Sequence, residues 1–400
     1  MVFVKILIIL IPFATAFYLG RIIIPFIYLI SYRKRLFDPI NKRKVHGNII
    51  PRLGGVAFAP IQCCLMTLAI VIFHKYNFLN DLHLNTGEIL PMFLMLTTGL
   101  VILFVVGIAD DLIGLNYKVK FTAQLAAAML FPLSGLWIND MYGVLFLTYL
   151  PAWLGMPLTL FAVILIINAI NLIDGIDGLC SGLIMVSSSI LGVLFALEGA
   201  WLHAIFAFVT TGLLIPFCYF NVFGASKRKR RIFMGDTGSM TLGYSIAFLA
   251  VSFSMNNPDV KPFFEGAIVS AFTTLMVPVL DVARVMWVRF RAGRSVFEPD
   301  RSHIHHKFLD LGYSHRATMI WIILIAIFFS VFNIVSVQYI SNNIVLALDV
   351  VLWALFHLGF KRLEARRMGA PAVKRQQRRK LAATPALSMK MAHTMQTDDL

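Results

Sequence analysis

Long apolar segments divide this 400-residue chain and constrain its fold more than any other feature. Runs of about 17–25 apolar residues are long enough for a helix to cross a bilayer and too long for the strands of a membrane barrel. The chain is 59% hydrophobic and 14% charged, with a mean hydropathy of +0.80, whereas soluble domains are about a quarter charged. These values predict an all-α, polytopic integral membrane protein. We expect about eleven transmembrane helices, near residues 3–30, 54–75, 89–109, 121–138, 156–172, 179–197, 201–222, 238–255, 264–287, 318–338 and 344–360.

The basic residues predict the orientation of these helices. Of the 35 Lys and Arg residues, 30 lie in the segments 31–53, 110–120, 223–236, 288–317 and 361–400, which an odd number of helices places on one side. By the positive-inside rule this side is cytoplasmic, so the N-terminus is outside and the C-terminus is cytoplasmic. The net charge of +15 then reflects topology, and we expect no nucleic-acid partner. Residues 1–360 form the membrane domain, and 361–400 form a basic tail that we expect to be disordered.

A polar stripe interrupts the apolar pattern between two of the predicted helices. Asn168, Asn171, Asp174 and Asp177 follow one another at intervals of three residues, which places them on one face of a helix. Such groups cost several kcal/mol at membrane depth unless they are paired or hydrated, so they mark functional sites. A polar helix end that simply meets water would explain one aspartate but not the whole stripe.

Two further clusters lie at predicted cytoplasmic helix ends. Asp110 and Asp111 are adjacent, so on a helix they point about 100° apart; a bound cation would offset their unfavourable place at a helix C-terminus. The segment from Gly235 to Ser239 opens a helix, whose N-terminus attracts phosphate, and Asp236 could hold the accompanying Mg²⁺. The alternatives are two solvated loop acids and an ordinary capped turn.

Cationic residues surround the same predicted site. His303, His305 and His306 lie in a basic loop, where they could bind Zn²⁺, contact phosphate or have no role. Lys44 belongs to a basic segment before Gly54 and Gly55, and Lys120 lies at the cytoplasmic start of a helix; for any single basic residue, topology is the simpler explanation. Oxygen ligands and many cations together favour a diphosphate substrate and phosphoryl transfer. A wholly intramembrane architecture adds a lipid as the second substrate.

The motifs resemble those of the polyprenyl-phosphate N-acetylhexosamine-1-phosphate transferases. Five of them occur in the family's order across residues 1–360: IPRLGG (50–55), DD (110–111), NAINLIDGIDGL (168–179), FMGDTGSM (233–240) and DRSHIHHK (300–307). The closest branch resembles the bacterial undecaprenyl-phosphate N-acetylglucosaminyl-1-phosphate transferases. The peptidoglycan branch, which transfers phospho-N-acetylmuramoyl-pentapeptide, is the alternative, but it has a different glycine loop and three contiguous histidines.

The resemblance implies a role for each candidate residue. Asp236 and Asn171 would hold Mg²⁺, with Mn²⁺ as the alternative, on the diphosphate of a UDP-N-acetylhexosamine. Uracil would stack on Phe233. The nucleotide-sugar site would also include Asp174, Asp177, Asn221, Gly235, Lys120 and Lys44. The catalytic set would be Asp110, Asp111, His303, His305 and His306, in which either aspartate could accept a proton from the lipid phosphate or help to hold the metal.

The implied reaction is the attack of undecaprenyl phosphate on the sugar-bearing phosphorus, with release of UMP. The residues allow either direct transfer or an aspartyl-phosphate intermediate, and they do not select the hexosamine epimer. We expect the site to face the cytoplasm from a bacterial cytoplasmic membrane. A homodimer is one of the oligomeric states that the sequence allows. The basic segment Lys227–Arg231 is longer than the family pattern, which weakens the transfer of a nucleotide role to Asn221.

Two other functional classes share some of these features but fit the sequence less well. A CDP-alcohol phosphotransferase also has Asp-Gly pairs, but it needs further helix-spaced aspartates, and residues 178–195 contain none. A secondary transporter usually shows internal repeats and polar breaks near the membrane midplane, whereas the polar groups here gather at one membrane face.

Overall fold

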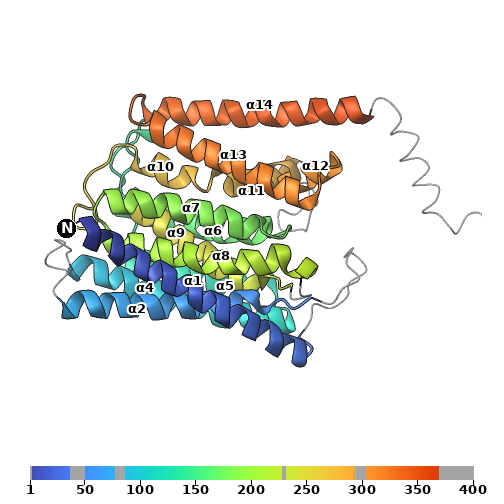
Figure 1. Cartoon of the computed structure of the whole chain (residues 1–400). Helices are drawn as coiled ribbons and strands as arrows, with labels where there is room; N and C mark the ends of the chain where they lie inside the picture. The colour runs from blue at the N-terminus through green and yellow to red at the C-terminus, as the bar shows by residue number, and fades with distance from the viewer. Residues whose placement is uncertain are drawn as a thin grey trace, which may run out of the picture.

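The computed structural model describes residues 2–36, 50–76, 86–227, 231–291, 293 and 303–368. In these ranges the chain is helical without named strands, and Figure 1 shows most of the long helices running along a common direction. The helices are α1 (Val2–Arg33), α2 (Phe58–Lys75), α4 (Thr86–Ile113), α5 (Tyr117–Leu133), α6 (Ala152–Ile173), α7 (Leu179–Leu197), α8 (Trp201–Lys227), α9 (Gly235–Ser254), α10 (Ala267–Thr273), α11 (Met276–Arg291), α12 (Ile304–Asp310), α13 (His315–Ser336) and α14 (Asn342–Met368), with short 3-10 turns η1 (Leu53–Ala57) and η2 (Val144–Phe146).

Every predicted apolar segment contains a helix, although the one predicted over 121–138 is helical only to Leu133. This confirms the all-helical membrane class. Among the described residues, eight helices are long and apolar enough to cross a membrane. The segment predicted as one helix over 264–287 is instead two helices, α10 and α11, bent by 75°. α5 has 17 residues, and α9 is rich in Gly, Ser and Thr, so neither meets that standard. A total of eleven crossings therefore stays a prediction.

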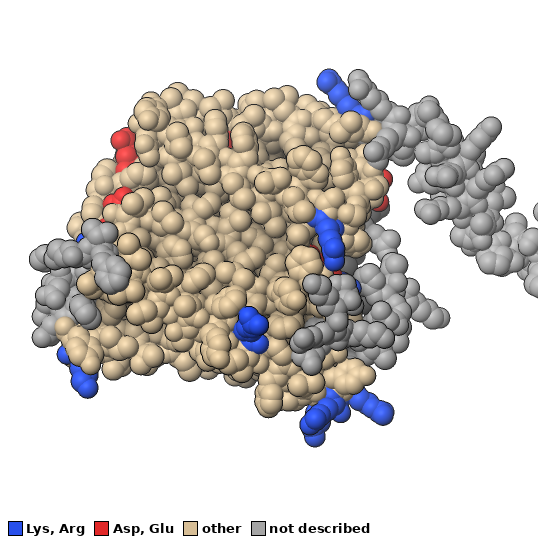
Figure 2. All heavy atoms as spheres, viewed as in Figure 1, with Lys and Arg blue, Asp and Glu red and all other residues tan. Residues whose placement is uncertain are grey.

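The orientation of the helices in the bundle agrees with an odd number of crossings. In Figure 1 the start of α1 and the end of α14 lie at opposite ends of the molecule. Figure 2 shows one face on which most atoms belong to neither acidic nor basic residues, and the charged side chains lie mainly toward the two ends. This distribution is typical of a protein embedded in lipid.

α9 lies at the centre of the bundle, where every residue from Thr237 to Ser254 is buried. It packs against α4, α6, α7 and α10. A Cβ added to Gly107 of α4 would come within 2.5 Å of Cα of Thr237, and one added to Gly243 would come within 2.8 Å of Cα of Ile167 on α6. Because these positions lack side chains, the three helices approach closely, as is usual in membrane bundles. This packing fixes the first turn of α9 against the ends of α4 and α6.

Candidate active site

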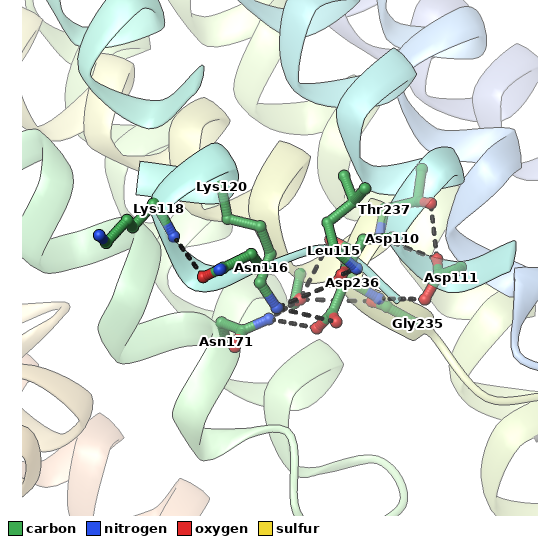
Figure 3. A network of polar contacts seen from close by, with 11 residues as sticks. Asp110, Asp111, Leu115, Asn116, Lys118, Lys120, Asn171, Gly235, Asp236 and Thr237 are labelled. Atoms are coloured by element: carbon green, nitrogen blue, oxygen red, sulfur yellow. Dashed lines mark hydrogen bonds and ion pairs between the residues drawn. The ribbon is translucent and has the colours of Figure 1, made fainter. Parts of the chain in front are cut away.

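The predicted acidic clusters meet at one end of the bundle. The last turn of α4 carries Asp110 and Asp111, and α5 begins near Lys120. α6 ends just beyond Asn171, and α9 begins with Gly235 and Asp236. Figure 3 shows these side chains converging from the consecutive helices α4 and α5 and from α6 and α9, which lie further along the chain. The apolar segments alternate in direction, and this brings the four polar ends to the same side.

Asp111 binds the first turn of α9. Its Oδ1 accepts the backbone N–H of Asp236 at 2.8 Å, and its Oδ2 accepts both the N–H and the hydroxyl of Thr237, at 3.0 and 2.6 Å (Figure 3). The first N–H groups of a helix lack partners within that helix and carry partial positive charge. The preceding residue, Met234, offers no side-chain cap. Asp111 therefore caps α9 from another helix and holds the backbone of Asp236 in place.

Asp110 has different partners from Asp111. Its Oδ1 accepts the N–H of Leu115 at 2.7 Å, and its Oδ2 lies 3.0 Å from Nζ of Lys120 (Figure 3). The same ammonium group lies 3.6 Å from Oδ2 of Asp236. Burial alone would raise the pKa of Asp236, but hydrogen bonding to Asp110 and Asn171 and the charge of Lys120 lower it overall. Lys120 thus lies between two carboxylates.

The donor atoms around Asp236 suit a magnesium ion. Asn171 donates to Oδ1 of Asp236 at 2.6 Å and to the hydroxyl of Ser239 at 2.8 Å (Figure 3). No group of three or more His, Cys, Asp or Glu with metal-site geometry occurs in the part of the chain that the structure describes. Mg²⁺, however, usually takes one or two carboxylates, water and substrate phosphates. The carboxylates of Asp110 and Asp236 fit that requirement, whereas Asn171 presents its NH₂ group to Asp236 and would offer its oxygen to a metal only after its amide rotates. Hard oxygen donors of this kind do not suit a metal that prefers thiolates.

The loop before α9 is fixed by the IPRLGG motif. Phe233 donates its N–H to the carbonyl of Pro51 at 2.8 Å, while the N–H groups of Gly54 and Gly55 bind the carbonyls of Phe233 and Met234 at 2.9 and 2.8 Å. Gly235 has φ +75°, and an added Cβ would collide with the carbonyl oxygen of Arg52. The motif therefore places Phe233 and the start of α9. Lys44, predicted in the nucleotide site, lies outside the described residues.

Asn221 connects the two parts of the predicted nucleoside site. Its side chain accepts the N–H of Gly178 at 2.6 Å and donates to the carbonyl of Ile232 at 2.9 Å. It thereby joins the turn after α6 to the residue before Phe233. The amide oxygen and nitrogen of Asn221 both bind backbone groups, so this side chain supports the walls of the site. A direct contact with the nucleotide stays a prediction.

Arg231, the last residue of the basic segment, lies at the predicted nucleoside site. Its guanidinium forms an ion pair with Asp177 and lies 5.3 Å from the ring centroid of Phe233. Asp174 is partly open to water at the turn after α6. The pKa of Asp174 is nevertheless raised, because the surrounding protein desolvates its carboxylate and the charges of Asp236 and Asp111 repel it. The two aspartates of the turn therefore differ, because Asp177 has a cationic partner and Asp174 faces the acidic cluster.

The histidines come together beside this turn. The rings of His303 and His305 are parallel with centroids 5.9 Å apart, and those of His305 and His306 are 4.2 Å apart. A Cβ added to Gly175 would lie 2.6 Å from Nε2 of His305. Burial, and to a smaller extent the neighbouring His306 and His303, lower the pKa of His305 to about 3. His305 is thus neutral at ordinary pH.

One partner of the histidines was not among the predicted site residues. Nδ1 of His303 lies 2.9 Å from Oδ2 of Asp281, a fully buried carboxylate on α11. An ionisable residue inside a membrane segment signals a functional role, so its position in the 264–287 segment was an available indication. Its partner His303, 22 residues further on, could not be identified from that pattern.

The comparisons with known proteins agree with the motifs. The sequence model of glycosyl transferase family 4 matches residues 92–254. A probable undecaprenyl-phosphate N-acetylglucosaminyl 1-phosphate transferase of Bacillus subtilis (strain 168) is 34% identical over 316 residues, which is 78% of this chain and 81% of the relative. Undecaprenyl-phosphate alpha-N-acetylglucosaminyl 1-phosphate transferases of Yersinia pestis and Escherichia coli (strain K12) are each 28% identical, over 82% and 88% of this chain and 84% and 91% of the relatives. The chain therefore belongs to the polyprenyl-phosphate N-acetylhexosamine-1-phosphate transferases of glycosyl transferase family 4.

Proposed function

We propose that this protein transfers N-acetylglucosamine 1-phosphate from UDP-N-acetylglucosamine to undecaprenyl phosphate and releases UMP. The family and the names of the relatives support the two substrates. The observation that carries the proposal is the arrangement of Asp110, Lys120 and Asp236 around one point, with Asn171 beside them. Its product would be the first lipid-linked intermediate of a cell-surface polysaccharide. The bilayer would be the bacterial cytoplasmic membrane, with this end of the bundle facing the cytoplasm.

The chemistry requires an oxygen of the lipid phosphate to attack the sugar-bearing phosphorus. A new P–O bond forms, the bond to the bridging oxygen breaks, and UMP leaves with that oxygen. Such a transfer depends mainly on positioning and on neutralising charge. Lys120 would neutralise phosphate oxygens, and Asp110 would accept a proton from a protonated lipid phosphate. Bound Mg²⁺, held by Asp236 and Asn171, would neutralise the diphosphate.

The direct test is UMP release by the purified protein in proteoliposomes that contain undecaprenyl phosphate. We expect release with UDP-N-acetylglucosamine and Mg²⁺, and loss of release with EDTA or in the Asp236→Ala variant. Asp349→Ala is the matched control, because that carboxylate lies on α14 and binds Asn333 of α13. Full activity of the Asp236 variant would refute the metal assignment.

The choice of substrates separates the remaining functions. A panel of UDP-sugars identifies the epimer, and turnover of UDP-N-acetylmuramoyl-pentapeptide alone would place the protein in the peptidoglycan branch. Uptake of a UDP-sugar without UMP release would indicate a transporter. Isothermal titration of UMP with and without Mg²⁺ shows in addition whether the metal is needed for binding or only for turnover.

A further inference from the structure

Asp281 is a buried carboxylate that the proposed phosphate chemistry does not use. It lies on α11, and no part of it is exposed. Its Oδ1 accepts the N–H of Ile304 at 3.0 Å and a guanidinium N–H of Arg284 at 2.9 Å, and its Oδ2 lies 2.9 Å from Nδ1 of His303. A buried charge with three partners is expensive to assemble and costly to disrupt, so the arrangement calls for an explanation.

The partners of Asp281 determine where the proton of His303 resides. An ionised carboxylate only accepts hydrogen bonds, so Nδ1 of His303 must carry hydrogen in this pair. A neutral imidazole then has its lone pair on Nε2, which points away from Asp281. Because Ile304 and Arg284 occupy Oδ1, the carboxylate cannot rotate freely, and Oδ2 stays directed at the ring. Carboxylates orient metal-binding histidines in the same way.

His303 is joined to the candidate site through its neighbour. Its ring lies parallel to that of His305 at 5.9 Å, and His305 abuts Gly175 in the turn that carries Asp174. The N–H of Ile304, the first residue of α12, also binds Asp281. The same carboxylate therefore fixes both the ring of His303 and the start of the helix that carries the other two histidines.

We propose that Asp281 is a positioning residue that sets the tautomer of His303, so that Nε2 accepts a hydrogen bond from an O–H group of the nucleotide sugar or of the lipid phosphate. This inference rests on the proposed function and deepens it. It assigns to the histidine loop a ring held in one orientation, with Nδ1 on Asp281 and Nε2 on the opposite side of the ring.

The Asp281→Asn variant tests the inference directly. Its amide oxygen would stay with the donors Ile304 and Arg284, so its NH₂ group would face Nδ1 of His303. That nitrogen must then accept, and the hydrogen moves to Nε2. In ¹⁵N NMR spectra of histidine-labelled protein, assigned with His303→Gln, we expect Nδ1 to be protonated in the wild type and Nε2 in the variant.

Turnover supplies the second measurement. By analogy with the carboxylates that orient metal-binding histidines, we expect kcat/KM to fall by about 10–100-fold in Asp281→Asn. The double variant with His303→Ala should be no worse than His303→Ala alone, since Asp281 acts through that ring. Asp349→Asn makes the same chemical change in another buried membrane carboxylate and should alter neither the tautomer nor the rate.

Two results would overturn the proposal. One is a wild-type spectrum with hydrogen on Nε2 of His303, which remains informative if the variant does not fold. The other is multiplication of the Asp281→Asn and His303→Ala effects in the double variant. Absence of UMP release from the wild-type protein would refute the proposed function instead, and it would leave the tautomer measurement valid.

Discussion

Asp110 and Asp111 are adjacent, yet we expect replacement by Asn to affect mainly stability at Asp111 and mainly turnover at Asp110. The carboxylate of Asp111 receives three hydrogen bonds from the first turn of α9, whereas Asp110 binds Lys120 and one backbone N–H. Asp111→Asn should therefore lower the unfolding temperature. Asp110→Asn should stop turnover in a protein that remains stable.

The size of the Asp111 effect follows from its partners. Asn keeps one acceptor oxygen, and its NH₂ group would face an N–H donor of Asp236 or Thr237. A hydrogen bond to a charged group contributes about 1.5–3 kcal/mol, and a negative charge at a helix N-terminus contributes about 0.3–1 kcal/mol. The expected loss is about 2–4 kcal/mol, or about 4–8 °C at roughly 2 °C per kcal/mol for a large chain. Thr237→Val removes only the hydroxyl donor and should cost about 1 kcal/mol.

Asp110→Asn should behave differently in the same assays. Asn can still accept the N–H of Leu115, and losing the charge weakens the pair with Lys120 while it relieves repulsion with Asp236. Because Lys120 keeps Asp236 as a partner, we expect a smaller loss of stability than in Asp111→Asn, and a fall in turnover of about 10²–10⁴-fold if this carboxylate accepts the proton. Thermal unfolding in detergent and UMP release measure the two quantities. An Asp111→Asn protein that unfolds at the wild-type temperature would refute this division of roles.

Three further predictions concern the histidines and the nucleoside side of the site. The pKa of His305 is lowered to about 3 from an ordinary 6.5, so below pH 6.5 the unfolded chain gains a proton that the folded protein lacks, and about 2 kcal/mol of stability is lost at pH 5. His305→Gln should remove this loss, seen as a smaller drop in unfolding temperature between pH 7.5 and 5; an equal drop would contradict the assignment. Gly175→Ala should displace His305 and reduce turnover by about 10–100-fold, whereas Gly359→Ala, where an added Cβ has open space, should not. Arg231→Ala should uncover the ring of Phe233 and tighten UMP binding by about two- to fivefold, measured by titration calorimetry; weaker binding would mean that Arg231 contacts the nucleotide.

The sequence was sufficient to predict the helices and to place the polar clusters together, for a simple physical reason. Apolar length defines each helix, and helices alternate in direction, so Asp110, Asn171 and Asp236 had to reach one side of the membrane. Their roles could not be predicted in the same way. Asp111 acts on residues 125 and 126 positions away, and Asp110 differs from it only by the rotation of one residue along a helix. Such contacts depend on packing that no local pattern records.

The bend between α10 and α11 was missed although the sequence contains a signal for it. Pro278, in the first turn of α11, has no N–H for the carbonyl of Thr274, and that carbonyl accepts the hydroxyl of Ser187 instead. The hydrophobic pattern alone predicted one helix over 264–287, which bends by 75° here. In the folded chain the hydroxyl of Thr273 donates to the carbonyl of Phe329 on α13, and Asn333 donates to that hydroxyl. These interhelical bonds support the bend, and their partners lie more than 50 residues away.

The charges of the site explain why a metal would matter for binding as well as for turnover. Asp110 and Asp236 share one ammonium group, and the charge of Asp111 is offset by helix N–H groups. At Asp174, desolvation and repulsion from Asp236 and Asp111 raise the pKa, and the charge of Arg52 offsets only part of this effect. A diphosphate would bring further negative charge to a region that already carries an excess. Lys120 and Arg52 supply positive charge to these carboxylates, and a divalent cation held by Asp236 would add to it. We therefore predict that removal of the metal weakens UMP binding as well as turnover.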